Sequence, residues 1–207
     1  MKKLLVAVAL TFAASAANAN VVSGQLEVVG SGTVTLGTSP LTTFNPRNSS
    51  GALFLPAFTS GNTGSLFAKY AGKFTATFLG NESGFKNFYV DGTNVLTTRN
   101  NGGVTGDTAT VNVAAGLVNF SFGTTGKATG GFTNGQVNTA AKGIAFFLDP
   151  KGVFDFIIGF NDSAPNLADY DDMVVGVNLV PVPAALPLMA SALGLFGLSR
   201  RNKKAAV

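Results

Sequence analysis

The clearest evidence of the fold comes from two dense apolar runs near the end of the chain, Phe154-Asp155-Phe156-Ile157-Ile158 and Met173-Val174-Val175-Gly176-Val177. A third run, Ile144-Ala145-Phe146-Phe147-Leu148, has the same character. All three are short, rich in β-branched and aromatic residues, and flanked by Gly, Asn, Asp or Pro, which is typical of buried β-strands. We therefore predict that they form the central strands of a sheet.

Shorter runs upstream alternate apolar and polar residues, as half-buried strands do. They are Lys73-Phe74-Thr75-Ala76-Thr77-Phe78, Val111-Asn112-Val113 and Val118-Asn119-Phe120-Ser121-Phe122. Clusters of Gly, Asn, Ser and Thr separate them, and the stretch from Gly123 to Gly135 is expected to be a long loop. The pattern predicts about ten to twelve antiparallel strands and no helix outside the chain ends. We expect one all-β domain at residues 20–179, an antiparallel β-sandwich of jelly-roll type.

The composition excludes several kinds of site. The 207 residues include no Cys, His or Trp, so thiol and Ser-His nucleophiles and metal sites built from Cys or His are ruled out. The formal net charge of +4 comes from the chain ends, where six of the 14 basic residues lie. The region between carries all 10 acidic residues. We therefore expect no nucleic-acid partner.

The N-terminus has the three parts of a secretory signal. Lys2-Lys3 precedes an apolar run from Leu4 to Ala14, and Ala17-Asn18-Ala19 then places small residues at the −3 and −1 positions of a cut after Ala19. We predict a signal helix at residues 1–19 that signal peptidase removes. A retained membrane helix is disfavoured, because the run is shorter than the ~20 apolar residues that a span needs.

The C-terminus, residues 180–207, combines three further features in a fixed order. Pro181-Val182-Pro183 keeps the chain extended, an apolar stretch follows from Ala184 to Leu198, and the end is basic, with Arg200, Arg201, Lys203 and Lys204. Fifteen helical residues rise about 22 Å, which crosses a bilayer only with local thinning or snorkelling. The basic end is expected to stay in the cytoplasm. The sequence thus predicts a C-terminal transmembrane helix in the inner membrane.

This order of features resembles the PEP-CTERM sorting signal of exported Gram-negative proteins, in its Pro-x-Pro-Ala-Ala variant. The resemblance covers about the last 28 residues, and Val182 stands where the family usually has Glu. It implies that an exosortase, a membrane cysteine transpeptidase, cuts near Pro181-Val182-Pro183 after the tail has held the protein in the inner membrane. A permanent single-pass anchor is the alternative.

Six of the ten acidic residues lie within 24 positions: Asp149, Asp155, Asp162, Asp169, Asp171 and Asp172. Part of this segment, Ala168 to Val175, resembles a sequence that recurs in secreted proteins with such tails. Carboxylates and amides are the ligands that Ca²⁺ takes, and carboxylates this close repel each other unless a cation neutralises them. The candidate ligands are Asp162, Asp169 and Asp171, with Asn161 and Asp172 in support. An ordinary cluster of turn-capping, solvated acids explains the pattern equally well.

The resemblance implies a structural or adhesive protein of the cell surface or of an extracellular, exopolysaccharide or biofilm matrix, with no enzymatic activity. Extracellular polysaccharide is then an expected partner. Two alternatives stay open. One is a non-catalytic carbohydrate-binding module, and the other is a secreted glycosidase that uses two Asp carboxylates.

Overall fold

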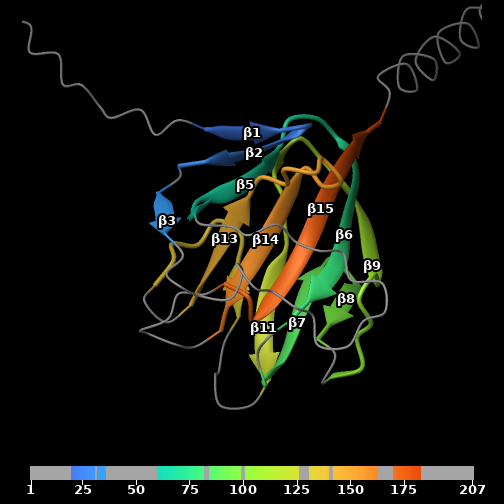
Figure 1. Ribbon diagram of the computed structural model, residues 1–207. Coiled ribbons are helices and arrows are strands. Elements are labelled where there is room, and N and C mark those ends of the chain that lie inside the picture. The colour runs from blue at the N-terminus through green and yellow to red at the C-terminus, as the bar shows by residue number, and fades with distance from the viewer. Residues whose placement is uncertain are drawn as a thin grey trace, which may run out of the picture.

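The computed structural model describes residues 20–30, 32–35, 60–81, 84–98, 101–125, 131–139, 142–162 and 170–182. These residues form 15 β-strands, every paired strand is antiparallel, and none of them lies in an α-helix (Figure 1). The predicted all-β, antiparallel fold is therefore confirmed for the described part of the chain. Within it, no helix is long and apolar enough to cross a membrane. The predicted signal and tail helices lie outside the described residues.

The largest sheet has seven strands and contains the three runs that were expected at its centre. In spatial order they are β3 (Thr33–Thr35), β4 (Ser60–Asn62), β13 (Gly143–Phe147), β14 (Phe156–Asn161), β15 (Met173–Pro181), β6 (Gly72–Gly80) and β9 (Thr108–Val113). β14 therefore occupies the middle position.

Strand β14 begins two residues later than predicted. The Asp149 carboxylate accepts hydrogen bonds from the backbone N–H groups of Lys151, Val153 and Phe154 at 2.9 to 3.0 Å. These bonds fold the chain before β14 into a turn, so Phe154 stays outside the strand.

Two four-stranded sheets complete the fold. One contains β1 (Val21–Ser23), β2 (Leu26–Val29), β5 (Ser65–Ala68) and β10 (Gly116–Leu117). The other contains β12 (Phe132–Thr133), β11 (Ser121–Thr125), β7 (Lys86–Asp91) and β8 (Asn94–Thr97).

The prediction of a long loop from Gly123 to Gly135 was wrong near both of its ends. β11 extends to Thr125, and β12 lies inside the expected loop. Gly123 does not make a turn. It lies beneath the Phe88 ring of β7, where a Cβ atom would collide with that ring. The glycine is needed there for close packing between neighbouring strands.

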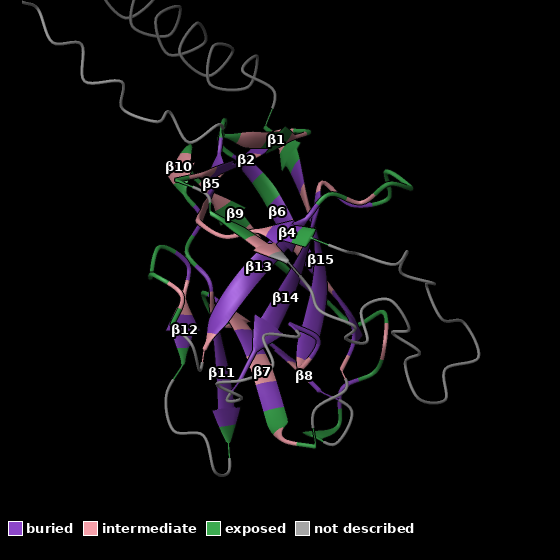
Figure 2. Cartoon of the chain, turned by 60° about the vertical axis from the view of Figure 1, so that its left-hand side comes forward, coloured by how far each residue is buried: buried purple, intermediate pink, exposed green. Residues whose placement is uncertain are grey.

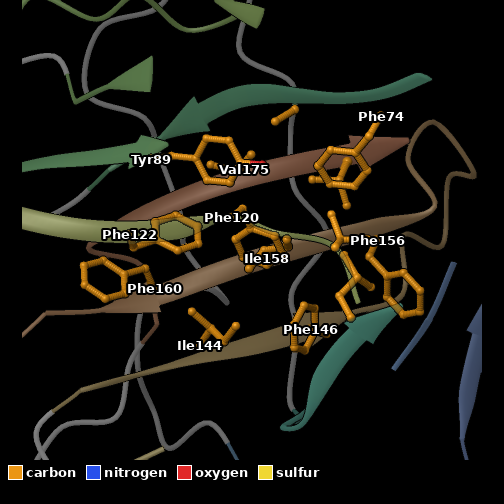
Figure 3. Packing of buried hydrophobic residues seen from close by; sticks show 14 of the residues in the cluster. Phe74, Tyr89, Phe120, Phe122, Ile144, Phe146, Phe156, Ile158, Phe160 and Val175 are labelled. Atoms are coloured by element: carbon orange, nitrogen blue, oxygen red, sulfur yellow. The ribbon is translucent and has the colours of Figure 1, made fainter. Parts of the chain in front are cut away.

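One hydrophobic cluster contains residues from all three sheets and lies between the seven-stranded sheet and the two smaller ones. Its largest fully buried side chains include Phe74, Tyr89, Phe122, Phe156 and Phe160 (Figure 3). The rings of Phe122 and Phe160 stack at 5.0 Å across the sheets. Each such ring contributes roughly 2 to 3 kcal/mol through burial, so this interface is the main source of stability.

The three central strands of the seven-stranded sheet are buried on both faces, and Figure 2 shows them buried along almost their whole length. On the second face, Phe154 and Tyr170 pack directly on glycines. A Cβ atom at Gly176 would collide with the Phe154 ring, and one at Gly159 would collide with the Tyr170 carbonyl oxygen. Burial on both faces explains why these strands have continuous apolar sequences without alternation.

Candidate functional site: a polar layer at one end of the core

The acidic cluster of the sequence separates into two groups in space, because β14 runs between them. Asp149 and Asp155 precede this strand, whereas Asp162 follows it and Asp171 and Asp172 precede β15. Seven residues of extended chain from Asp155 to Asp162 span about 23 Å. The six acids therefore cannot form one site.

The carboxylates of the first group accept hydrogen bonds from backbone N–H groups. Asp149 caps the turn before β14, as described above. Asp155 accepts a hydrogen bond from the backbone N–H of Leu179 at 2.9 Å, and its own N–H donates to Asn178 Oδ1 at 2.8 Å. Partial burial raises the pKa of the Asp155 carboxyl, while the Leu179 hydrogen bond opposes that shift. These contacts match the turn-capping interpretation for this group.

The second group lies where β14 ends and β15 begins, and it contacts β7 of a different sheet. The side-chain amide of Asn87 donates to Asp162 Oδ2 at 2.8 Å and to the backbone carbonyl of Asp172 at 3.1 Å. The backbone N–H of Asp162 donates to Asp172 Oδ2 at 2.7 Å. Asn87 is fully buried, and Asp162 is 2% exposed. The orientation of the Asn87 amide is fixed, because both of its partners only accept.

Strand registers place further polar residues beside Asn87. Thr124 of β11 lies directly opposite Asn87 and is buried. Thr98, which follows β8, bonds both backbone groups of Asn87 on the other side. Tyr89 lies two residues after Asn87 on β7, and Phe122 lies two residues before Thr124 on β11; both aromatic rings face the core. Because side chains two apart on a strand share a face, Asn87 and Thr124 face the interior too.

Two acids adjoin the inward-facing core residues of the seven-stranded sheet. Asp162 follows Phe160 by two residues, and Asp171 precedes Met173 by two, and both Phe160 and Met173 belong to the shared core. The Asp162 carboxylate reaches the interior, because Asn87 bonds it there, and Asp162 and Asp171 are only 2% and 1% exposed. We call Asn87, Thr124, Asp162 and Asp171 the polar layer. It borders the aromatic core at the end where Phe122 and Phe160 stack.

Two oxygens of the polar layer have no hydrogen-bond partner among the described residues. They are Asn87 Oδ1 and Thr124 Oγ1. An orphaned buried oxygen costs about 1 to 3 kcal/mol. Two of them beside two buried carboxylates require an explanation, such as a bound ion or water.

The residues expected to bind calcium are only partly brought together. Asp162 bonds Asn87, and its N–H donates to Asp172 Oδ2, whereas Asn161 alternates with the inward Phe160 on β14. Asp171 is buried, and Asp169 lies outside the described residues. No group of three or more acidic side chains is placed around one point in the described ranges.

Sequence reasoning missed Asn87 and Thr124. In β7, alternation of the apolar residues Phe88 and Val90 suggests that these two side chains face the core. The structure shows the opposite, because the buried, inward positions are Asn87, Tyr89 and Asp91. The sequence signal for an inward Asn87 was its spacing, because Asn87 lies two residues before Tyr89 and so shares its face.

A second buried acid lies further along β7. The Tyr89 hydroxyl donates to Asp91 Oδ2 at 3.2 Å, and Asn94 Nδ2 donates to Asp91 Oδ1 at 3.0 Å. Desolvation raises the pKa of the Asp91 carboxyl, and desolvation together with the neighbouring Asp91 charge raises the pKa of Tyr89. Both residues are fully buried, so this pair is part of the core.

Of the processing residues, the structure describes Pro181 and Val182. Pro181 is the last residue of β15 and pairs with Gly72, and the Val182 N–H donates to the Ala71 carbonyl at 3.0 Å. The other predicted positions lie outside the described residues: Ala17, Ala19, Pro183, Arg200, Arg201, Lys203 and Lys204.

Comparisons of the chain with protein-family models, with curated proteins and with solved structures found no match.

Proposed function

We propose that this chain is an exported structural or adhesive protein of the cell surface or extracellular matrix, and that an exosortase processes its C-terminal tail. Its domain would be a β-sandwich of jelly-roll type, without catalytic activity. The observation that carries the proposal is the ordered tail, in which Pro181-Val182-Pro183 is followed by an apolar stretch and a basic end.

The geometry of the domain is compatible with processing at both ends of the chain. β1 and the last residues of β15 lie at the same end of the molecule (Figure 1). Asp155 links them, since its carboxylate bonds the Leu179 N–H and also lies against Gly24 in the turn between β1 and β2. A cut after Ala19 and a cut near Pro183 would therefore both occur at one end of the domain.

The test is intact-mass analysis of the full-length chain expressed in a host with and without an exosortase. We expect the mature protein to begin at Asn20 and to lack Arg200 to Lys204 only when the exosortase is present. Replacing Pro181 and Pro183 by Ala should block the C-terminal cut, whereas Pro150→Ala, at an exposed turn, should not. A mature protein that retains the basic end in the presence of the enzyme would favour a permanent anchor.

A carbohydrate-binding module is the second candidate, and one surface favours it. On the outer face of β6 and β9, Thr75 and Thr110 lie opposite each other with their hydroxyls 3.2 Å apart, next to the exposed Lys73 and Asn112. Such a row of donors and acceptors suits an extended glycan chain. Sedimentation with insoluble polysaccharides should show binding that Thr75→Val/Thr110→Val abolishes. Release of reducing sugar in the same assay would instead support the glycosidase alternative.

A further inference from the structure

The polar layer has the composition of a site for a hard cation. Its members carry the carboxylates of Asp162 and Asp171, the amide oxygen of Asn87 and the hydroxyl oxygen of Thr124, and Asn87 both bonds Asp162 and lies opposite Thr124. All four residues are at least nine-tenths buried, and all four supply oxygen. Ca²⁺ binds six to eight oxygens from carboxylates, amides, hydroxyls, carbonyls and water, without a strict geometry.

The unpartnered oxygens are independent of the acidic cluster and point to a ligand. Asn87 uses both amide hydrogens on Asp162 and Asp172, so its Oδ1 lies in the layer without a donor among the described residues. Thr124 Oγ1, directly across the β7–β11 pair, is in the same situation. A cation would satisfy both oxygens at once.

The charge of this region favours a cation as well. Asp162 follows β14, and Asp171 and Asp172 precede β15, the neighbouring antiparallel strand. Extending the β13–β14 register by one residue sets Lys142 beside Asp162. A cation would compensate for the hydration that the buried carboxylates of Asp162 and Asp171 lose on folding.

We propose that the polar layer binds one Ca²⁺ ion between two sheets, with Asp162, Asp171, Asn87 and Thr124 as its side-chain ligands. The ion ties β7 and β11 to the end of the β14–β15 pair. This site differs from the loop site expected from the sequence, because two of its ligands come from a different sheet. It does not rest on the proposed export of the chain.

The test compares melting temperatures of the full-length chain, purified in mild detergent, in about 5 mM CaCl₂ and in excess chelator. At roughly ten times the Kd typical of extracellular calcium sites, binding to the folded state should raise the melting temperature by about 3 to 5 °C. Mg²⁺ should give a smaller shift, because it loses its water reluctantly. Calorimetric titration with CaCl₂ should show one binding event.

Thr124→Val gives the sharpest variant, because its effect should differ between the two conditions. In chelator it should melt at the same temperature as the unsubstituted chain or higher, since a methyl group replaces an unpartnered hydroxyl. The rise in melting temperature that calcium causes should be half or less of that in the unsubstituted chain. Asp162→Asn should abolish the shift, whereas Thr108→Val, at an exposed position of β9, should leave it unchanged.

Three results would overturn the site. The first is equal melting temperatures in calcium and chelator with no heat of binding, which would mean that water satisfies the two oxygens. The second is a calcium shift that Thr124→Val and Asp162→Asn both retain, which would place the ion elsewhere. The third is a clear loss of stability of Thr124→Val in chelator, which would mean that the hydroxyl has a partner. If Asp162→Asn does not fold, Thr124→Val and the calorimetry still decide.

Discussion

The side-chain amide of Asn87 donates a 2.8 Å hydrogen bond to Asp162 Oδ2, which joins β7 in one sheet to the end of β14 in another, 75 residues later in the chain. Both residues are almost completely buried. The bond therefore replaces the hydration that the Asp162 carboxylate loses on folding. Hydrophobic contacts hold the sheets together, and this polar contact helps to fix their relative position.

Asn87→Ala should destabilise the protein by about 2 to 3 kcal/mol, because it leaves the Asp162 carboxylate and the Asp172 carbonyl without their shared donor. Urea unfolding in the presence of chelator measures the effect without any contribution from a cation. The matched control is Asn119→Ala, at an exposed position, which should change stability by less than about 0.5 kcal/mol. Equal effects of the two variants would contradict the structural role of Asn87.

Asn134 is expected to be the main polar link between the two small sheets. Its side chain accepts from the Leu66 N–H at 2.9 Å and donates to the carbonyls of Leu66 at 2.9 Å and Val118 at 2.7 Å. Asn134→Ala should cost about 3 kcal/mol, because three buried backbone groups lose a partner. Amide hydrogen exchange should then show reduced protection at Leu66. Unchanged exchange at that amide would argue that the sheets hold together without Asn134.

Gly159→Ala should be among the most destabilising glycine substitutions, at about 3 kcal/mol. The added Cβ would meet the Tyr170 carbonyl oxygen, a backbone atom that cannot turn away as a side chain does. Tyr170 itself has a left-handed backbone, with φ of 55°, which limits how far it can move. Gly84→Ala is the control, since nothing lies within 4 Å of its added Cβ. Thermal or urea unfolding of the two variants should differ clearly, and similar stabilities would show that Tyr170 does not pack on this strand.

Stability should fall as the pH rises through the weakly acidic range. Desolvation raises the pKa of Asp91 in the folded state above the ordinary value of about 3.9. Between the ordinary and the raised pKa the folded state binds more protons than the unfolded state. The free energy of unfolding therefore declines as the pH rises across that interval and levels off above it. Asp155 contributes in the same direction.

Asp91→Asn should remove the Asp91 contribution to this pH dependence. The measurement is the free energy of unfolding in urea from about pH 4 to pH 7, with and without the substitution. We expect the difference between the two proteins to change with pH in the lower part of this range and to be constant above it. A difference that is constant throughout would mean that the carboxyl is not desolvated.

Several parts of the fold could be predicted because they are local. The runs at Ile144, Phe156 and Met173 are dense in apolar, β-branched and aromatic residues, and they form the three central strands β13, β14 and β15. The shortest strands were not predicted, because two to four residues, as in β10 and β12, are too few to show a period. Alternation correctly placed Val118, Phe120 and Phe122 in the core. It did not reveal that β11 starts only at Ser121, since hydrogen-bond partners are not encoded in that pattern.

Local sequence patterns were enough to predict that the described residues form antiparallel β-strands and which runs are central, whereas the signal and the tail stay predictions. These properties depend on the composition and periodicity of neighbouring residues. Which polar groups meet depends on tertiary packing, which separated Asp149 and Asp155 from Asp162 and brought Asn87, with Thr124 opposite it, from another sheet to Asp162. A strand holds its two ends far apart, while the packing of two sheets brings together residues that no local pattern relates.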